Sequence, residues 1–212
     1  AGSAPDGRVS VVEIGAEVPE LTPGEPTAAS GEAAVAALKA AVAALKAGDI
    51  DVLVTAPISK EAVQSDKFRF PGHTEYLEAA LGDGSKARMI LFDDNVRVAL
   101  VSTHLPVSKV AEAVTKESVD AAIDSLNLSL RQDFGFERPK IAVLSLNPHA
   151  GDGGVLGTEE KEIIEPAIAE FREKGVLAFG PFAADGFFGL GDYRKFDGIV
   201  AMYHDQGLAP FK

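Results

Sequence analysis

Short apolar segments rich in β-branched residues alternate in this chain with longer segments of helical character, and this alternation constrains the fold more than any other feature. The expected strands are ARMILF, VRVALVS, KIAVLSL (140–146) and FDGIVAMY, which ends at Tyr203. Three helices are expected in this part of the chain. One begins after Ser108, the next begins after Thr115 and runs to about Gln132, and the last runs from Glu159 to Lys174 and is closed by Gly175. Strands that alternate with long helices indicate an open α/β sheet with helices on both faces.

The beginning of the chain shows a weaker form of the same pattern. Val9–Ile14 predicts a strand, and a Pro- and Gly-rich connection follows it. A helix is expected between Ser30, a suitable N-cap residue, and Gly48, because alanines fill this interval and Glu32 suits the first turn. Asp51–Thr55 (DVLVT) is short, β-branched and apolar, which is typical of a buried parallel strand.

The composition excludes several functions. With 212 residues, 46% of them hydrophobic and 25% charged, the chain has the balance of a soluble globular protein. Its net charge of -12 makes nucleic acids and anionic membranes poor partners, because such surfaces bind proteins through basic residues. The absence of cysteine excludes disulfides, thiolate nucleophiles and zinc fingers, so any metal would be bound by histidine and carboxylate side chains.

The sequence gives no indication of a membrane segment or of export. The alanine-rich stretch 33–47 is interrupted by Lys39 and Lys46, and the opening AGSAPDGRVS has no apolar region of the kind found in signal peptides. We therefore expect a cytoplasmic protein that binds neither membrane nor nucleic acid.

Three of the four histidines directly follow predicted strands. His104 comes after VRVALVST, His149 after KIAVLSLN and His204 after GIVAMY. Open α/β sheets bind ligands beyond the carboxyl ends of their strands, so we expect these imidazoles at one edge of the sheet. Three neutral imidazoles suit a divalent transition metal and leave coordination positions for substrate oxygens. The sequence thus predicts a metal site, although each histidine alone could simply hydrogen-bond a neighbouring carbonyl group.

Three further segments carry candidate functional residues. His73 lies in FPGHTE before a predicted helix, where an imidazole and exposed amides suit a carboxylate or phosphate, although an ordinary capping segment fits equally well. Asp185, in AADGFF, is an acid among apolar residues and is either a proton-transfer group or a turn aspartate. Lys212, after HDQGLAPF, offers a cation to a phosphate or an alkoxide, or is simply solvated surface.

The motifs of this chain resemble those of the 4-hydroxythreonine-4-phosphate dehydrogenase family of pyridoxal phosphate biosynthesis. In order, they are VTAPISK, GHTE, THLPV, NPHAGDGG, GTEE, ADGFF and AMYHDQGLAPFK, from about Asp51 to Lys212. The resemblance implies a fold related to the isocitrate and isopropylmalate dehydrogenases, a three-layer α/β/α architecture in two domains that works as a homodimer. It also implies NAD-dependent oxidation of 4-phosphohydroxy-L-threonine, with loss of CO₂ to give 3-amino-2-oxopropyl phosphate.

The same resemblance implies a metal site shared between two subunits. His104 and His149 correspond to ligands of one subunit, and the third ligand corresponds to His204 of the partner subunit. Zinc is the expected metal, with magnesium, cobalt, nickel and manganese as alternatives. The resemblance identifies NAD as a cofactor but does not identify the residues of this chain that contact it.

Substrate-binding and proton-transfer roles follow from the resemblance too. His73 and Thr74 correspond to substrate contacts, and Lys212 to a contact of the substrate phosphate or hydroxyl group. Asp185 corresponds to an acid of proton transfer. A dication bound to the substrate hydroxyl would lower the pKa of that hydroxyl, so that a base such as Asp185 could remove its proton.

The chain departs from the family at both ends. Family members begin with a glycine-rich strand-turn segment and continue well beyond the position of Lys212, so we expect a fragment truncated at both ends. Residues 1–68 are expected to be a remnant of the first domain, and 69–212 most of the second, metal-binding and dimer-forming domain. The activity of this part alone is doubtful. Two alternatives are a dehydrogenase of threonate or erythronate 4-phosphate and a non-catalytic dimerisation or binding module.

Overall fold

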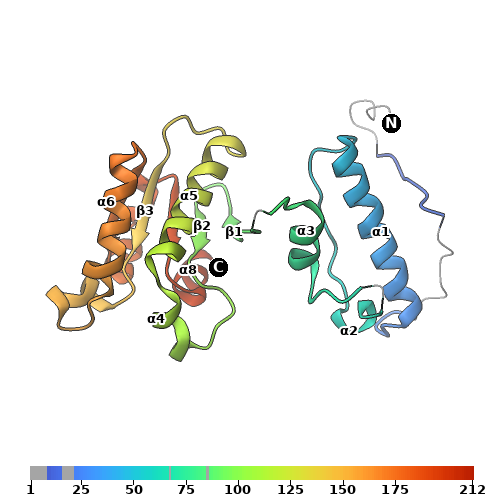
Figure 1. Ribbon diagram of the computed structural model, residues 1–212, viewed down its shortest axis with the longest axis horizontal. Coiled ribbons are helices and arrows are strands. Elements are labelled where there is room, and N and C mark those ends of the chain that lie inside the picture. The colour runs from blue at the N-terminus through green and yellow to red at the C-terminus, as the bar shows by residue number, and fades with distance from the viewer. Residues whose placement is uncertain (1–8, 16–21, 67, 85) are drawn as a thin grey trace. The chain divides into compact units, whose positions relative to one another are not determined.

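The computed structural model describes residues 9–15, 22–66, 68–84 and 86–212, which fall into two compact units (Figure 1). The first unit ends at Ala87, and the second runs from Arg88 to Lys212. The boundary between residues 68 and 69 that the family resemblance predicts concerns the domains of the complete family fold, so it stays a prediction.

Helix α1 (Ala28–Ala47) is the main element of the first unit. The Thr27 hydroxyl accepts a hydrogen bond from the backbone N–H of Ser30 at 3.2 Å, and the Ser30 hydroxyl accepts one from the N–H of Thr27 at 3.0 Å. This capping box satisfies the first turn, so the N-cap is Thr27, three residues before the predicted cap Ser30. Gly48 ends it in the left-handed conformation, with φ 73°. The predicted helix is therefore confirmed.

Two shorter helices pack with α1 in the first unit. They are α2 (Lys60–Val63) and α3 (His73–Leu81). The small core between these elements contains Val35, Leu38, Val63 and Phe68. The ring of Phe68 lies 5.3 Å from that of Tyr76 and thereby joins α3 to this core.

Among the described residues, α1 is the one helix that is long and apolar enough to cross a membrane. Core helices of soluble proteins pass the same test of length and composition, so the finding is weak evidence for a membrane span. One side of α1 is buried within its own unit, through Gly31, Val35, Leu38 and Val42.

The two strands predicted in the first unit are wrong. Neither Val9–Ile14 nor Asp51–Thr55 forms a strand, and Val9 and Val54 are 95% and 89% exposed. Both segments have the side chains of a strand, but a strand is stable only when neighbouring backbone satisfies its N–H and C=O groups. In the described part of the first unit no strand lies beside them.

The second unit contains a five-stranded sheet with the order β1-β2-β5-β3-β4. The strands are β1 (Ile90–Phe92), β2 (Arg97–Leu100), β3 (Lys140–Leu144), β4 (Leu177–Phe182) and β5 (Gly198–Ala201). β1 and β2 are antiparallel, whereas the pairs β2–β5, β5–β3 and β3–β4 are parallel. The four predicted strands of this unit are confirmed, and β4 is an additional strand that the sequence pattern did not reveal.

The helical elements of the second unit alternate with the strands. They are η1 (Val107–Lys109), α4 (Val110–Ala113), α5 (Lys116–Gln132), η2 (Pro148–Gly154), the π-helical turn η3 (Glu160–Ile164), α6 (Glu165–Glu173), α7 (Ala184–Gly189), η4 (Asp192–Lys195) and α8 (His204–Phe211). The predicted helix from Glu159 is confirmed as η3 followed by α6, and Gly175 follows it with a φ of 84°. α7 and α8 were not predicted.

Alternate residues of the strands point into two apolar cores on opposite faces of the sheet. Ile141 and Val143 pack under α5 and α6, whereas Ala142 and Leu144 pack against α7 and α8. Burial of each large aliphatic side chain contributes roughly 1.5–3 kcal/mol, so the two cores stabilise the sheet from both sides. The second unit therefore has the predicted three-layer α/β/α architecture.

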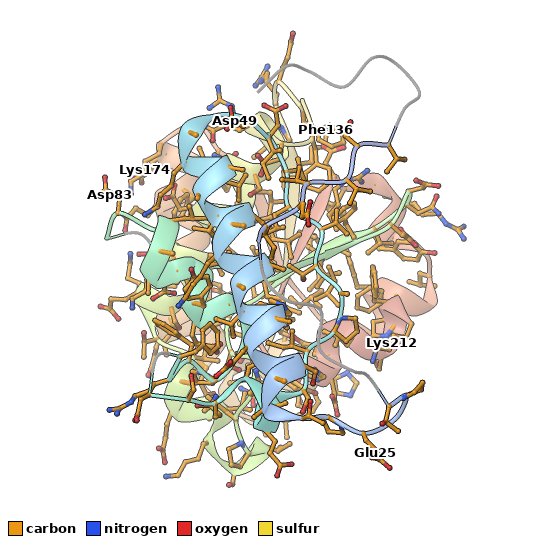
Figure 2. The ribbon with its side chains drawn as sticks, turned by 90° about the vertical axis from the view of Figure 1, so that its right-hand side faces the viewer. Glu25, Asp49, Asp83, Phe136, Lys174 and Lys212 are labelled. Carbon is orange, nitrogen blue, oxygen red and sulfur yellow. The ribbon has the colours of Figure 1, made fainter. Side chains whose placement is uncertain are left out.

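An ion network joins α5 to α6 on the surface of the second unit. The Nζ of Lys116 lies 2.6 Å from Asp120 and 2.5 Å from Glu170, and Lys174 (labelled in Figure 2) lies 2.7 Å from Glu170. Hydrogen bonds from Lys116 and then Lys174 lower the pKa of the Glu170 carboxyl to about 2. Bonds to Asp120 and then Glu170 raise the pKa of the Lys116 ammonium group. Because these groups remain partly exposed, solvent weakens their contribution to stability.

Candidate active site

The second unit brings two of the predicted site histidines together. His104 follows β2, and His204 begins α8 three residues after the end of β5; β2 and β5 are neighbouring parallel strands. Their ring centroids lie 6.0 Å apart. The two imidazoles line one cavity of about 240 Å³, together with Thr103, Val107 and Tyr203.

A neighbouring carboxylate orients the imidazole of His204. Nδ1 of His204 and Oδ1 of Asp205 lie 2.7 Å apart, so the hydrogen bond uses Nδ1 and leaves Nε2 available. Metal-binding histidines commonly direct their second ring nitrogen to a carboxylate in this way, which fixes the tautomer and the ring direction. The Asp205–His204 pair therefore suits a ligand that binds at Nε2.

The third histidine, His149, opens into an adjacent cavity of about 530 Å³. Asp185, Phe188 and Gln206 line this cavity with it. Tyr203 and Asp205 line both this cavity and the smaller one that contains His104 and His204. The cavities thus share a wall at the carboxyl end of β5, and all three histidines lie at the carboxyl edge of the parallel strands.

The imidazoles are chemically suitable for a divalent metal, but one copy of the chain does not bring a complete set together. Within a single copy, the residues that the structure describes contain no group of three or more His, Cys, Asp or Glu side chains able to hold a metal ion. His104 shares its cavity with His204 rather than with His149. The predicted ligand set drawn from two subunits stays a prediction.

His149 lies in an unusual backbone segment. Five successive residues from His149 to Gly153 have positive φ, including φ values of 54° for His149, 52° for Ala150 and 43° for Asp152. A residue with a Cβ atom is disfavoured in this conformation by roughly 1–2 kcal/mol, so the surrounding structure must stabilise the turn. The sequence NPHAGDGG suggests flexibility through its glycines, but it does not reveal that His149 itself is left-handed.

The amide of Gln206 links the strand ends that precede His149 and His204. Its Oε1 accepts a hydrogen bond from the backbone N–H of Met202 at 2.7 Å, and its Nε2 donates to the carbonyl oxygen of Ser145 at 2.7 Å. Met202 follows β5 and Ser145 follows β3. Sequence reasoning missed this residue, because a glutamine inside the YHDQG motif has no signature that separates a structural from a surface role.

The predicted proton-transfer residue, Asp185, lies in the first turn of α7 and is exposed where it lines the cavity of His149. The apolar surroundings expected from AADGFF are found on one side only: Phe187 is buried in the sheet core, while Asp185 points to the cavity and solvent. This difference arises because the two residues lie on different sides of a short helix.

The other predicted substrate contacts lie away from these cavities or in the first unit. Lys212 is exposed directly after α8 (Figure 2). Its backbone N–H donates to the carbonyl oxygen of Leu208 at 3.0 Å. It lines neither of the two histidine cavities. His73 and Thr74 are the first two residues of α3 in the first unit. The roles of these three residues stay predictions.

Imidazole and carboxylate side chains beyond the carboxyl ends of parallel strands in a three-layer sheet define the layout of an α/β enzyme domain that binds a small ligand at that edge. Comparison of the sequence with known families identifies the particular group. The chain belongs to the family described as pyridoxal phosphate biosynthetic protein PdxA, which it matches over residues 2–212. The resemblance found in the sequence motifs is therefore confirmed.

Named relatives agree with this assignment. A 4-hydroxythreonine-4-phosphate dehydrogenase from Bacteroides thetaiotaomicron is 61% identical over 165 residues, which cover 78% of this chain and 45% of the relative. A protein of the same name from Prosthecochloris aestuarii is 43% identical over 100% of this chain and 63% of its own length. This chain thus spans about half to two thirds of the length of these relatives.

Solved structures show the same fold. A crystal structure of 4-hydroxythreonine-4-phosphate dehydrogenase from Klebsiella pneumoniae has a TM-score of 0.82 at 35% identity and covers 90% of this chain and 58% of that one. A terephthalate 1,2-cis-dihydrodiol dehydrogenase from Burkholderia xenovorans has a TM-score of 0.69 at 29% identity, over 90% of this chain and 60% of that one. The fold therefore occurs in dehydrogenases named for different substrates.

Proposed function

We propose that this chain is part of a NAD-dependent 4-hydroxythreonine-4-phosphate dehydrogenase, which oxidises the secondary alcohol of 4-phosphohydroxy-L-threonine and releases CO₂ to give 3-amino-2-oxopropyl phosphate. The observation that carries this proposal is the 61% identity to a relative of that name. The presence of histidine and carboxylate side chains at the carboxyl edge of the sheet supports it, because this chemistry needs a polarised hydroxyl group and a base beside it.

His104, His149 and His204 are the proposed metal ligands, with the set completed across a homodimer. Their neutral imidazoles fit zinc, and equally cobalt, nickel or manganese, without adding negative charge that would reduce the Lewis acidity of the ion. The bound metal would polarise the substrate hydroxyl and later the carbonyl group. The hydrogen bond that Nδ1 of His204 donates to Asp205 supports this assignment, because it fixes the ring for coordination through Nε2.

Asp185 is the proposed proton acceptor for the substrate hydroxyl group. It lines the same cavity as His149, and about 530 Å³ is within the range of ordinary small-molecule sites. Its exposure gives the proton a path to solvent. Further proposed contacts of the phosphorylated substrate are His73, Thr74 and Lys212. We assign no residue of this chain to NAD, which accepts the hydride when it is bound.

A steady-state assay tests the proposal. The complete protein that contains this chain, loaded with zinc or cobalt, is mixed with NAD and 4-phosphohydroxy-L-threonine, and NADH absorbance is followed with wild type and the variants His149→Ala and Asp185→Asn. We expect turnover by wild type and at least about 100-fold lower turnover by both variants, because general acid–base catalysis and metal assistance would be lost. Full activity of both variants would refute the assigned roles.

A related substrate is the second candidate function. The diol dehydrogenase named among the structural relatives shows that the fold accompanies more than one named substrate, and a threonate or erythronate 4-phosphate has a similar four-carbon skeleton. Turnover of 4-phosphohydroxy-L-threonine and of these two phosphates should be compared side by side in one preparation. A clear preference for a sugar-acid phosphate, measured as kcat/KM, would replace the proposed substrate.

The third candidate is a dimerisation or binding module without activity. This chain spans 45% of its Bacteroides relative, which is the observation that favours a partial site. Calorimetric titration of the 212-residue chain with NAD and with cobalt separates the candidates. Metal binding by a dimer without NAD binding would support the module, whereas binding of both ligands would favour the dehydrogenase.

A further inference from the structure

Glu160 is a buried carboxylate to which the proposed chemistry assigns no role. It is the first residue of η3, and only 1% of its surface is exposed. Three uncharged N–H groups donate to it. Its Oε1 accepts from the backbone N–H of Leu146 at 2.8 Å and of Asn147 at 2.7 Å, and its Oε2 accepts from the Asn147 side chain at 3.0 Å. A charge buried on neutral donors is costly, so this arrangement calls for an explanation.

These bonds connect Glu160 to the residues that precede the left-handed turn Pro148–Gly154, which contains His149. Leu146 and Asn147 are the last two residues before Pro148, the first residue of the turn. Only Pro148 separates this anchored backbone from His149. A displacement of the carboxylate would therefore move the start of the turn and, with it, the position of His149.

The turn also packs directly on the same carboxylate from its other end. A Cβ atom added to Gly151 would lie 2.7 Å from Oε2 of Glu160 and 2.9 Å from the carbonyl oxygen of Gly157. Gly151 is buried and has a φ of 77°. The backbone of the turn thus contacts Glu160 both before and after His149, and the absence of a side chain at residue 151 is what permits this approach.

We infer that Glu160 is the positioning residue of His149: its carboxylate holds the left-handed turn in the conformation that presents the imidazole to the proposed metal. The inference rests on the proposed metal role of His149 and deepens it. Glu160 is not itself a proposed ligand of the metal. It acts through Leu146, Asn147 and the backbone of the turn, as groups behind a ligating histidine do in other metal sites.

A carboxylate suits this position because its three hydrogen-bond partners are all donors. In Glu160→Gln, one oxygen could still accept the two backbone N–H bonds, but the new amide nitrogen would face the Asn147 side-chain nitrogen. Two donors cannot hydrogen-bond to each other, so the bond between the side chains of residues 147 and 160 would be lost. The substitution keeps the size of the side chain and therefore tests the acceptor role rather than the packing.

The test compares E160Q with E162Q, which makes the same change at an exposed position of the same helical turn. Cobalt is titrated into wild type, both variants and His149→Ala, and the visible absorption of the bound ion gives its affinity and the symmetry of its site. We expect cobalt affinity at least about 10-fold weaker for E160Q, with an altered spectrum, because loss of a group behind a metal ligand typically costs 10–100-fold. E162Q should match wild type.

Two outcomes separate this inference from the proposed function. If wild type binds cobalt and His149→Ala does not, while E160Q retains wild-type affinity and spectrum, the positioning role is wrong and the metal site stands. If wild type itself does not bind cobalt, the proposed metal site fails and the inference fails with it. Lower thermal stability of E160Q with unchanged cobalt affinity would identify a purely structural role and would also overturn the inference.

A milder variant covers the case in which E160Q does not fold. Asn147→Ala removes the side-chain donor to Oε2 of Glu160, together with its bond to Glu159, and keeps both backbone bonds to Oε1 of Glu160. We expect folded protein, checked by circular dichroism, with cobalt affinity weakened less than in E160Q but by a measurable factor. Wild-type affinity in this variant would contradict the positioning role.

Discussion

Segments of similar sequence adopt different structures in the two units of this chain. In the first unit, the β-branched segment that contains Val54 has no neighbouring strand among the described residues, and Val54 is 89% exposed. In the second unit, Val143 lies in a segment of the same character and is fully buried between β4 and β5. The difference shows that apolar, β-branched sequence indicates a need for neighbouring strands and does not by itself create a strand.

The units also differ in how their cores are built. The second unit has a core on each face of its sheet, whereas the described part of the first has one small cluster around Val35, Leu38, Val63 and Phe68. A substitution should therefore cost most stability in the sheet, less at the contact between α1 and α2, and least on a surface segment or ion pair. Three experiments measure this order.

The largest effect is expected from truncation of a central strand. Ile141→Ala removes a fully buried side chain from β3 and should lower the free energy of unfolding by about 2–5 kcal/mol, because it leaves a cavity under α5 and α6. Val54→Ala should change it by less than about 0.5 kcal/mol, as for other exposed positions. Urea denaturation followed by circular dichroism measures both. A cost for Val54→Ala comparable to that of Ile141→Ala would mean that the exposed segment is buried in solution.

An intermediate effect is expected at the contact between α1 and α2. A Cβ atom at Gly31 would lie 1.8 Å from the carbonyl oxygen of Ala62, so Gly31→Ala forces backbone apart and should cost about 1–3 kcal/mol. The control is Gly48→Ala, where a new Cβ has nothing within 4 Å and only the φ of 73° opposes the change, at about 1 kcal/mol. Thermal unfolding of both variants should rank Gly31→Ala as the less stable. The reverse order would contradict the packing of these two helices.

The smallest effect concerns the ion network between α5 and α6. Because the folded-state pKa of Glu170 is lowered from 4.5 to about 2, its contribution to stability is fully present above pH 4.5 and is lost as the pH falls toward 2. The stability difference between wild type and Glu170→Gln should therefore shrink across this interval. Urea midpoints measured at a series of pH values test this. A difference that stays constant would show that Glu170 does not titrate with a lowered pKa.

Much of the second unit follows from its sequence. The helix after Thr115 begins where the pattern predicts, because Thr115 and Ser118 form a reciprocal capping box. The strand β4 was missed, because its LAFGPF sequence contains a glycine and a proline, which usually mark the end of a strand. The helix α8 was missed for a similar reason, since Gly207 and Pro210 interrupt its pattern.

The location of the candidate site could be predicted from the sequence, but the residues that hold the histidine-bearing segments in place could not. The rule that ligands bind beyond the carboxyl ends of parallel strands placed His104, His149 and His204 at one edge. The order of the strands decides which of them are neighbours, and no local pattern encodes that order. The supporting residues Glu160 and Gln206 were missed for a similar reason. Glu160 accepts hydrogen bonds from residues 13 and 14 positions away, and Gln206 donates one to a residue 61 positions away, so no local pattern reveals these contacts.

The side-chain amide of Gln206 connects the ends of β3 and β5 in one orientation only. One end of this side chain must accept and the other must donate, because it meets an N–H group at Met202 and a carbonyl oxygen at Ser145. A glutamate of the same size could satisfy the first partner but would set oxygen against oxygen at the second. The strand ends that lead to His149 and His204 are therefore tied by a connector that fits in one orientation, and a shift of either end is transmitted to the other.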